Sequence, residues 1–175
     1  MILNIIMKQM NINNTTKGIA FFAVASLLLL ASCIKKTVED TYEQKLIDEF
    51  LVTWNVQIAP TLSGLYYIEE IEGTGEFPGF SDTVEVFYKG MFLDGRVFDS
   101  NIGGNIFSFP LGERRVIPGW EEGLSYMKKG GKAMLLIPSN LAYGSTGQGA
   151  IPPFTPLLFS VELVDLKFGP NHIIE

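Results

Sequence analysis

The stretch Val116-Ile117-Pro118-Gly119-Trp120-Glu121-Glu122-Gly123 predicts the start of a short helix that the rest of the chain surrounds. Pro118 suits the first helical position, because the N–H that proline lacks would have no partner there. Glu121 and Glu122 follow closely, and negative charge is favourable near the positive end of the helix dipole. These three residues indicate where the helix begins.

The apolar face of this helix is given by the residues that follow. Trp120, Leu124 and Met127 recur at spacings of four and three, which puts them on one side of a helix. Lys128 and Lys129 suit its C-terminal end, and the two glycines after them predict where it stops. A helix of about three turns with one apolar face is marginal alone, so strands must cover it.

Outward from this helix, apolar residues alternate with the period of strands. The expected segments are Leu65–Ile68, Val84–Tyr88, Met91–Phe98 with an Asp94-Gly95 turn, Phe107–Phe109, Ala133–Ile137 and Leu157–Leu166. Residues 141–156 are rich in Gly and Pro and are expected to form a loop. About five strands and one packed helix predict an α+β fold with an antiparallel sheet.

Composition limits the classes of protein to which this chain can belong. Of 175 residues, 47% are hydrophobic and 18% charged, which is ordinary for about one globular domain. The net charge is −6, and no nucleic-acid partner is expected, because phosphate contacts need clustered cations. One Cys excludes an intrachain disulfide and a Cys-rich metal site, and the one His, His172, argues against a His-based metal site or triad.

Residues 1–32 are interpreted as a signal peptide rather than as part of the fold. Lys17 precedes an apolar run over residues 18–31, which is shorter than the roughly 20 residues of a spanning helix. The run ends in Leu30-Ala31-Ser32-Cys33, which resembles the lipobox of bacterial lipoproteins. Lipidation of Cys33 is favoured over a plain cleavage site with a chance Cys. The expected location is the cell envelope, with a lipid anchor in the outer membrane facing the periplasm.

Residues 33–63 are expected to form a tether followed by an amphipathic helix. The helical stripe consists of Tyr42, Leu46, Ile47, Phe50, Leu51 and Trp54. Packing against the chain's own domain is favoured over a role as a dimer helix, because amphipathic helices usually bury their stripe within their own domain. The main domain is then expected over residues 64–168, with a tail over residues 169–175.

The predicted domain offers no arrangement for nucleophilic or acid–base catalysis. The stretch Gly144–Gly149 lacks the Gly-Lys-Ser/Thr ending of a phosphate loop. Glu121 and Glu122 are adjacent on a helix and face different directions, so the helix dipole explains them better than paired carboxylate chemistry does. What the sequence does offer is a set of aromatic side chains from different elements: Tyr88, Phe98, Phe107, Trp120, Tyr143 and Phe159.

This aromatic set has two interpretations. It can be an ordinary hydrophobic core. Tyr143, however, lies in the Gly-rich loop, and loops run over the protein surface. An aromatic loop residue beside a core of sheet and helix indicates an apolar cleft, which is the usual form of a ligand site.

Seven motifs in order, from about Gly64 to Leu166, resemble the FK506-binding-protein (FKBP) family of peptidyl-prolyl cis–trans isomerases. They are Val86–Gly90, Asp94–Ser100, Phe107–Gly112, Val116–Gly123, Ala142–Gly144, Ile151–Pro153 and Leu158–Leu163. The resemblance implies a curved, five-stranded antiparallel sheet wrapped around the short helix, with a ligand cleft between them. It also implies isomerisation of Xaa-Pro bonds in proline-containing polypeptides, with FK506-type macrolides as inhibitors.

The resemblance further implies roles for individual residues. Trp120 would form the floor of a proline pocket, and Asp99 would lie at the rim, hydrogen-bonded to Tyr88. The implied walls are Tyr88, Phe98, Phe107, Val116, Ile117 and Phe159. The Ile117 backbone N–H and the Tyr143 hydroxyl would donate hydrogen bonds to substrate carbonyl groups, and Ile151 would cover the pocket from the loop.

Such a reaction needs no cofactor and no metal, because rotation about a peptide bond neither makes nor breaks a covalent bond. We therefore expect a lipid-anchored prolyl isomerase that helps exported proteins to fold. The alternative is a non-catalytic proline-binding module or chaperone on the same fold, because a fold alone does not establish an activity.

Overall fold

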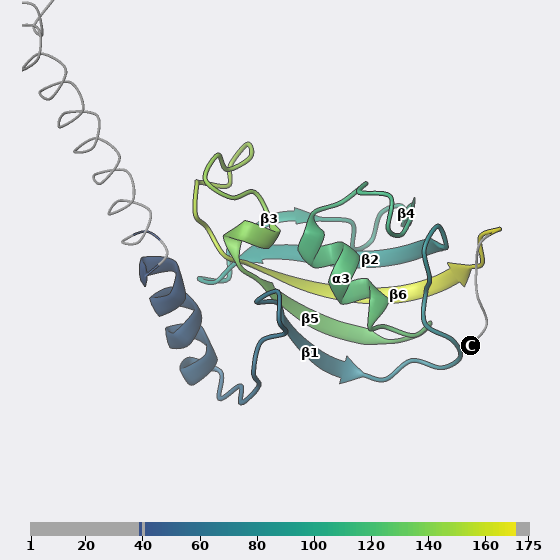
Figure 1. The fold of residues 1–175 in the computed structure, drawn as a ribbon, viewed down its shortest axis with the longest axis horizontal. Helices are drawn as coiled ribbons and strands as arrows, with labels where there is room; N and C mark the ends of the chain where they lie inside the picture. The colour runs from purple at the N-terminus through teal and green to yellow at the C-terminus, as the bar shows by residue number, and fades with distance from the viewer. Residues whose placement is uncertain (1–38, 40, 171–175) are drawn as a thin grey trace, which may run out of the picture. The chain divides into compact units, whose positions relative to one another are not determined.

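The structure, a computed structural model, describes residue 39 and residues 41–170. A helix over residues 41–53 comes first. The remaining elements are β1 (Tyr66–Ile71), β2 (Thr83–Phe92), β3 (Val97–Ser100), β4 (Phe107–Pro110), α3 (Pro118–Ser125), β5 (Lys132–Ile137), the 3₁₀ turn η1 (Ser139–Leu141) and β6 (Leu157–Lys167), as Figure 1 shows. The predicted signal peptide, Cys33 and His172 lie outside the described residues.

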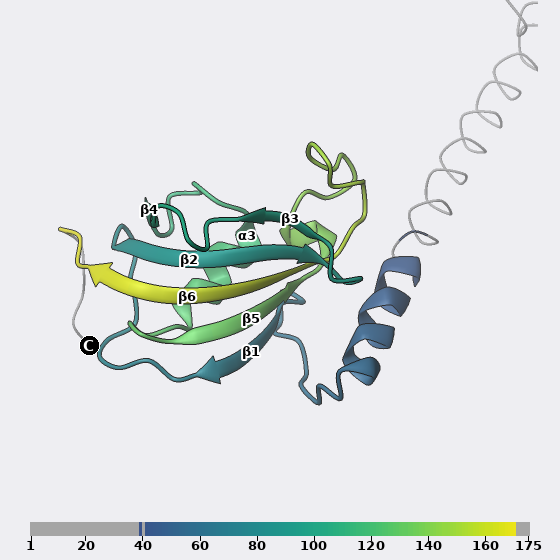
Figure 2. The same cartoon turned by 180° about the vertical axis from the view of Figure 1, so that it is seen from behind.

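All strand pairs in the sheet are antiparallel, and the strand order is β1-β5-β6-β2-β3, with β4 also paired to β2. The α+β class is confirmed. The predicted count of five strands is wrong by one, because two four-residue strands pair with different parts of β2. Strand β4 pairs with Thr83–Val86, and β3 pairs with Lys89–Met91. Figure 2 shows how β2 and β6 run side by side through the middle of the sheet.

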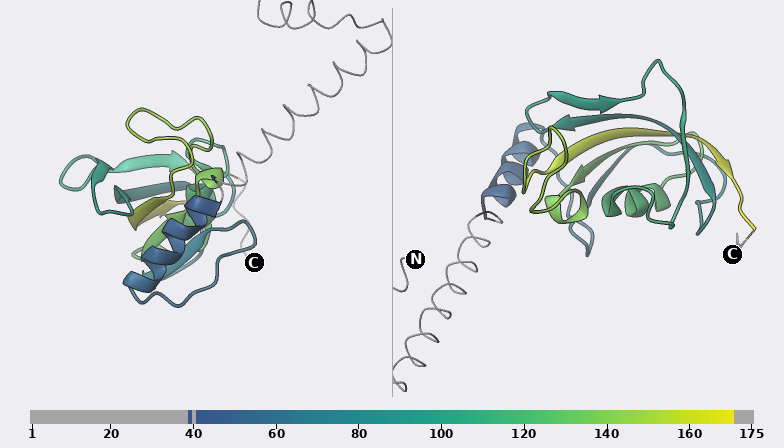
Figure 3. Two further views of the ribbon diagram at one scale, coloured as in Figure 1. Left: turned by 90° about the vertical axis from the view of Figure 1, so that its left-hand side faces the viewer. Right: turned by 90° about the horizontal axis from the view of Figure 1, so that it is seen from above.

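The curved sheet carries α3 on its hollow face, as the right-hand view of Figure 3 shows. Close approach is possible because α3 places glycines against β5. A Cβ atom on Gly119 would lie 2.5 Å from Ile137 Cγ2, and one on Gly123 would lie 2.7 Å from two atoms of Leu135. Trp120 and the other apolar residues of the helix are thereby brought into the main core.

The beginning of α3 is as predicted, and its end is not. Pro118 occupies the first turn, and Glu121 is the acidic residue there. The helix ends at Ser125, after eight residues instead of about three turns. Lys128 and Lys129 lie beyond it, where they form ion pairs with Glu72 and Asp165. Tertiary pairing of these lysines therefore replaces the predicted interaction with the helix end.

The helix over residues 41–53 packs on a second, smaller cluster. Ile47 and Phe50 are buried there against Tyr66, Leu136 and Leu158 of the sheet. The structure thus shows the favoured interpretation of the apolar stripe for its central residues. The outer members of the stripe differ: Tyr42 is 63% exposed and Trp54 is 66% exposed. In the described part of the chain, no helix combines the length and the apolar character needed to cross a membrane.

Candidate functional site

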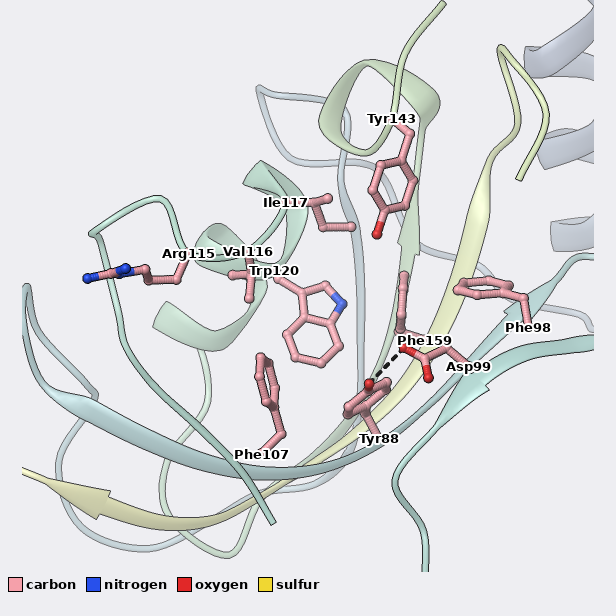
Figure 4. Close-up of a pocket in the computed structure, with 10 residues that line it drawn as sticks. All are labelled: Tyr88, Phe98, Asp99, Phe107, Arg115, Val116, Ile117, Trp120, Tyr143 and Phe159. Atoms are coloured by element: carbon pink, nitrogen blue, oxygen red, sulfur yellow. Dashed lines mark hydrogen bonds between the residues drawn. The ribbon is translucent and has the colours of Figure 1, made fainter. Parts of the chain in front are cut away.

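A pocket of about 180 Å³ opens between α3, the sheet and the loop that follows η1. Ten residues line it, and Figure 4 shows their side chains: Tyr88, Phe98, Asp99, Phe107, Arg115, Val116, Ile117, Trp120, Tyr143 and Phe159. Each strand from β2 to β4 contributes, together with β6 and the start of α3. Side chains that lie far apart in the sequence therefore meet around one space.

Trp120 occupies the centre of this set and is 4% exposed. Its ring meets three others edge to face, most closely the Tyr88 ring at 5.0 Å and 82° and the Phe159 ring at 5.2 Å and 87°, and then the Phe107 ring at 6.2 Å and 67°. Such perpendicular pairs are favourable because the positive ring edge meets the negative ring face. Among the described residues, none accepts a hydrogen bond from the Trp120 indole N–H. The pocket is thus floored by a rigid aromatic group whose one polar atom has no acceptor from this part of the chain.

Tyr88 and Asp99 form the polar edge of the pocket. The Tyr88 hydroxyl donates a 2.8 Å hydrogen bond to Asp99 Oδ2, which Figure 4 marks. Antiparallel pairing of β2 with β3 brings them together, because Lys89 lies opposite Ser100. Burial, followed by the hydrogen bond to Asp99, raises the pKa of Tyr88 to about 12.

Tyr143 approaches from the other side of the pocket. In Figure 4 its hydroxyl points into the space between Ile117 and Phe159. Burial and the negative charge of Asp99 raise the pKa of this hydroxyl. Tyr143 therefore stays protonated at neutral pH and can donate a hydrogen bond to a ligand.

Asn101, which the sequence analysis missed, attaches the segment after β3 to β2. Its Oδ1 accepts a 2.7 Å hydrogen bond from the Tyr88 backbone N–H, and its amide donates to the Val86 carbonyl oxygen at 3.0 Å. Ser100 adds a hydroxyl bond to the Tyr88 carbonyl oxygen at 3.1 Å. Asn commonly bonds to nearby backbone, but nothing in the local pattern indicated that its partners lie on another strand.

Gly90 is a second site-forming residue that the sequence analysis did not single out. A Cβ atom at this position would lie 2.7 Å from both Phe159 Cε1 and Phe98 Cζ. Only glycine therefore lets these two rings pack over the middle of β2, where their centroids lie 5.5 Å apart. Gly90 lies in one of the motifs of the family resemblance, but its contact with the two rings depends on the placement of β3 and β6.

The structure brings together nine of the ten side chains predicted for the pocket, and it adds Arg115. Ile117 precedes the helix in an extended conformation and accepts the Trp120 and Glu121 N–H groups at its carbonyl oxygen. Ile151 is placed differently. It is 7% exposed in the main core, is held by two backbone bonds to Gln148, and is not among the lining residues.

Within residues 39 and 41–170, no group of three or more His, Cys, Asp or Glu side chains is arranged to hold a metal ion. The polar groups of the lining side chains are instead two phenols, one carboxylate, the Trp120 indole N–H and the Arg115 guanidinium, which points away from the aromatic rings in Figure 4. Such a site can bind an apolar group in its centre and form hydrogen bonds at its rim.

Comparisons with known proteins agree with this geometry. The family profile described as FKBP-type peptidyl-prolyl cis-trans isomerase matches residues 75–164. The FKBP-type isomerase FkpA of Escherichia coli is 50% identical over 110 residues, which cover 62% of this chain and 40% of FkpA. A probable FKBP-type isomerase of Haemophilus influenzae is 38% identical over 162 residues, covering 91% of this chain and 65% of the relative.

A crystal structure of FkpA from Escherichia coli has the same fold, with a TM-score of 0.67 and 34% identity. That match covers 97% of this chain and 80% of the other. By sequence, the chain spans about 40% of the length of the FkpA relative.

Proposed function

Because the chain belongs to the FKBP-type peptidyl-prolyl cis-trans isomerase family, we propose that it catalyses rotation about Xaa-Pro bonds of polypeptides. One observation carries the proposal: aromatic side chains around Trp120 form a pocket, and the hydrogen-bonding groups of Tyr88, Asp99 and Tyr143 line its edge. A proline ring fits the apolar centre, and the polypeptide backbone on either side can meet the polar edge.

The physical difficulty of the reaction is the barrier to rotation, which is about 18–20 kcal/mol because resonance gives the C–N bond double-bond character. The planar amide carries charge separation that water stabilises. Placing the amide among Trp120, Phe159 and Phe107 removes that water and so raises the energy of the planar form relative to the twisted one.

Hydrogen bonds then act on the twisted form. We assign the Tyr143 hydroxyl and the Ile117 backbone N–H as donors to substrate carbonyl groups. Only bonds that are stronger in the transition state than in the ground state accelerate the reaction. Asp99 holds the Tyr88 hydroxyl at 2.8 Å and thereby fixes the orientation of the ring beside Trp120.

The proposal is tested by NMR exchange spectroscopy on an Xaa-Pro tetrapeptide with purified protein, with and without a metal chelator. We expect catalysed exchange that the chelator leaves unchanged. Absence of catalysis by folded protein, together with binding of the peptide, would instead establish the alternative of a non-catalytic proline-binding module or chaperone. Loss of activity with chelator would contradict the mechanism.

FK506-type macrolides are proposed as inhibitors that occupy the same pocket. Their binding should change Trp120 fluorescence, and Trp54→Phe removes the background of the second, largely exposed tryptophan. Full isomerase activity at a saturating macrolide concentration would contradict the assignment of the pocket.

A lipid anchor is proposed for Cys33, which lies outside the described residues. The support is the motif Leu30-Ala31-Ser32-Cys33 after an apolar run. Buried lipid chains contribute about 0.8 kcal/mol per CH₂ to membrane attachment. The protein would then assist the folding of exported proteins in the cell envelope, anchored to the outer membrane and facing the periplasm.

The anchor is tested by labelling cells with a radioactive fatty acid. Wild-type protein should carry label and sediment with membranes, whereas Cys33→Ser should be unlabelled and released. A labelled Cys33→Ser protein that remains in the membrane fraction would show that the lipid is attached elsewhere.

A further inference from the structure

Glu43 is a buried carboxylate that lies far from the pocket in sequence and outside the segment matched by the family profile. It sits on the helix over residues 41–53 and is 7% exposed. Both its oxygens accept hydrogen bonds from Ser139: Oε1 from the backbone N–H at 2.5 Å, and Oε2 from the hydroxyl at 2.7 Å. One residue of the main domain therefore satisfies this carboxylate twice.

Ser139 is also the residue that organises the chain around Tyr143. It begins η1 and is 4% exposed. Its carbonyl oxygen accepts the N–H of Ala142 at 2.9 Å and the N–H of Gly144 at 2.8 Å. These two residues flank Tyr143, so hydrogen bonds lead from Glu43 through Ser139 to both neighbours of a pocket residue.

Apolar contacts already attach the helix of Glu43 to the sheet. Ile47 and Phe50 of the same helix are already buried against Tyr66, Leu136 and Leu158. A buried charge is costly unless it is paired, and an apolar side chain of similar size would often serve stability as well. The two hydrogen bonds from Ser139 thus point to a role for Glu43 in positioning the segment that begins at Ser139, rather than in attaching the helix to the sheet.

We propose that Glu43 is a positioning residue of the isomerase site, acting through Ser139 to hold the Tyr143 hydroxyl at the pocket. The inference rests on the proposed function. The helix over residues 41–53 thereby becomes part of the catalytic unit, although Glu43 itself does not line the pocket.

A double-mutant cycle in the full chain tests the proposal through kcat/KM for one Xaa-Pro tetrapeptide. Glu43→Ala should lower kcat/KM about five- to tenfold, the effect of misplacing one hydrogen bond. In a Tyr143→Phe background, where the hydroxyl is already absent, Glu43→Ala should have less than about a twofold effect. Equal losses in both backgrounds, or none in folded protein, would overturn the proposal.

Two further variants separate the hydrogen bonds from charge and from folding. Glu43→Gln can still accept the Ser139 N–H and donate to its hydroxyl, so activity within about twofold of wild type is expected. Glu49→Gln makes the same charge change on an exposed position of the same helix and should have no effect. If Glu43→Ala does not fold, Ser139→Ala is measured in its place. It should lower kcat/KM by a smaller factor than Glu43→Ala, and only in protein that keeps the Tyr143 hydroxyl. A Ser139→Ala loss that persists in Tyr143→Phe protein would overturn the proposal.

Amide hydrogen exchange gives a readout that does not depend on activity. Exchange at Ala142 and Gly144 should be faster in Glu43→Ala than in wild type, while exchange in β2 and β6 should be unchanged. If the wild-type protein shows no isomerase activity, the proposed function is wrong. Hydrogen exchange then still tests whether Glu43 acts through Ser139 on the residues beside Tyr143. Unchanged exchange at both amides would show that the link does not exist.

Discussion

Around Trp120, single side chains have separable roles in packing and in hydrogen bonding. Phe98 contacts Phe92 and Phe159 and is only partly buried, because one side of its ring faces the pocket. Tyr143 contributes both a ring and a hydroxyl, and the hydroxyl points into the pocket. Substitutions at these two positions should therefore affect stability and activity to different extents.

Phe98→Ala should reduce turnover far more than folding stability. Truncating a fully buried aromatic costs about 3–5 kcal/mol, and a ring with one open side should cost less. Melting temperature and kcat/KM on one tetrapeptide measure the two effects. If the variant melts at a much lower temperature while its folded fraction keeps normal kcat/KM, Phe98 is a core residue and not a pocket wall.

Tyr143→Phe removes a hydroxyl and keeps the ring. We expect a loss of about 0.5–1.5 kcal/mol in transition-state binding, seen as a lower kcat/KM, with a nearly unchanged melting temperature. Tyr42→Phe, at a 63% exposed position outside the pocket, is the matched control. Activity of Tyr143→Phe equal to that of the control would remove the hydroxyl from the mechanism.

At the scale of elements, the close contact between α3 and β5 depends on two glycines of the helix. Intrinsic preference would place alanine rather than glycine within a helix, by about 1 kcal/mol. Gly119 and Gly123 oppose that preference, because their missing side chains let Ile137 and Leu135 approach the helix backbone. Packing against β5, rather than helix propensity, therefore explains the glycines on the side of α3 that contacts the sheet.

Gly123→Ala should destabilise the protein by about 1–3 kcal/mol despite its higher helix propensity, because the new Cβ atom would meet Leu135 at 2.7 Å. Gly104→Ala is the control, since its Cβ atom would have only Asn101 O nearby, at 3.4 Å. Chemical denaturation of both variants measures the difference. A Gly123→Ala protein as stable as wild type would show that α3 and β5 can separate at no cost.

For the molecule as a whole, two tyrosines with raised pKa values make the stability of the fold depend on pH in the alkaline range. Burial raises the pKa of Tyr67 and of Tyr88 to about 12 each, from an ordinary value of 10.0. Below pH 10 both phenols are protonated in the folded and unfolded chains. Between about pH 10 and 12 the unfolded chain releases protons that the folded chain retains, so stability falls as pH rises.

We expect kcat/KM to be constant between about pH 6 and 9, because the Tyr88 and Tyr143 phenols stay protonated and none of the described residues that line the pocket is a His. Unfolding free energy should decline as the pH rises above about 10, and it should decline less steeply in Tyr88→Phe. Denaturant titrations at several pH values measure the decline. An inflection of kcat/KM near pH 6.5 would indicate an ionisation that this mechanism lacks.

Local sequence patterns were sufficient to predict much of the fold and of the candidate site. The start of α3 at Pro118 follows from the conformational limits of proline and from charge near a helix end. The turn at Asp94-Gly95 is predictable because glycine adopts positive φ without strain, and Gly95 does have a φ of 86°. Recognition of ordered motifs then predicted nine of the pocket side chains.

Only the tertiary structure decided the features that join distant parts of the chain. Glu43 and Ser139 are 96 residues apart, Gly90 is constrained by rings from β3 and β6, and Asn101 bonds to a different strand. The end of α3 and the pairing of β3 and β4 with different parts of β2 were likewise decided by the tertiary structure. Periodicity and turn chemistry act within a few residues, whereas these contacts exist only after the sheet has set which strands are neighbours.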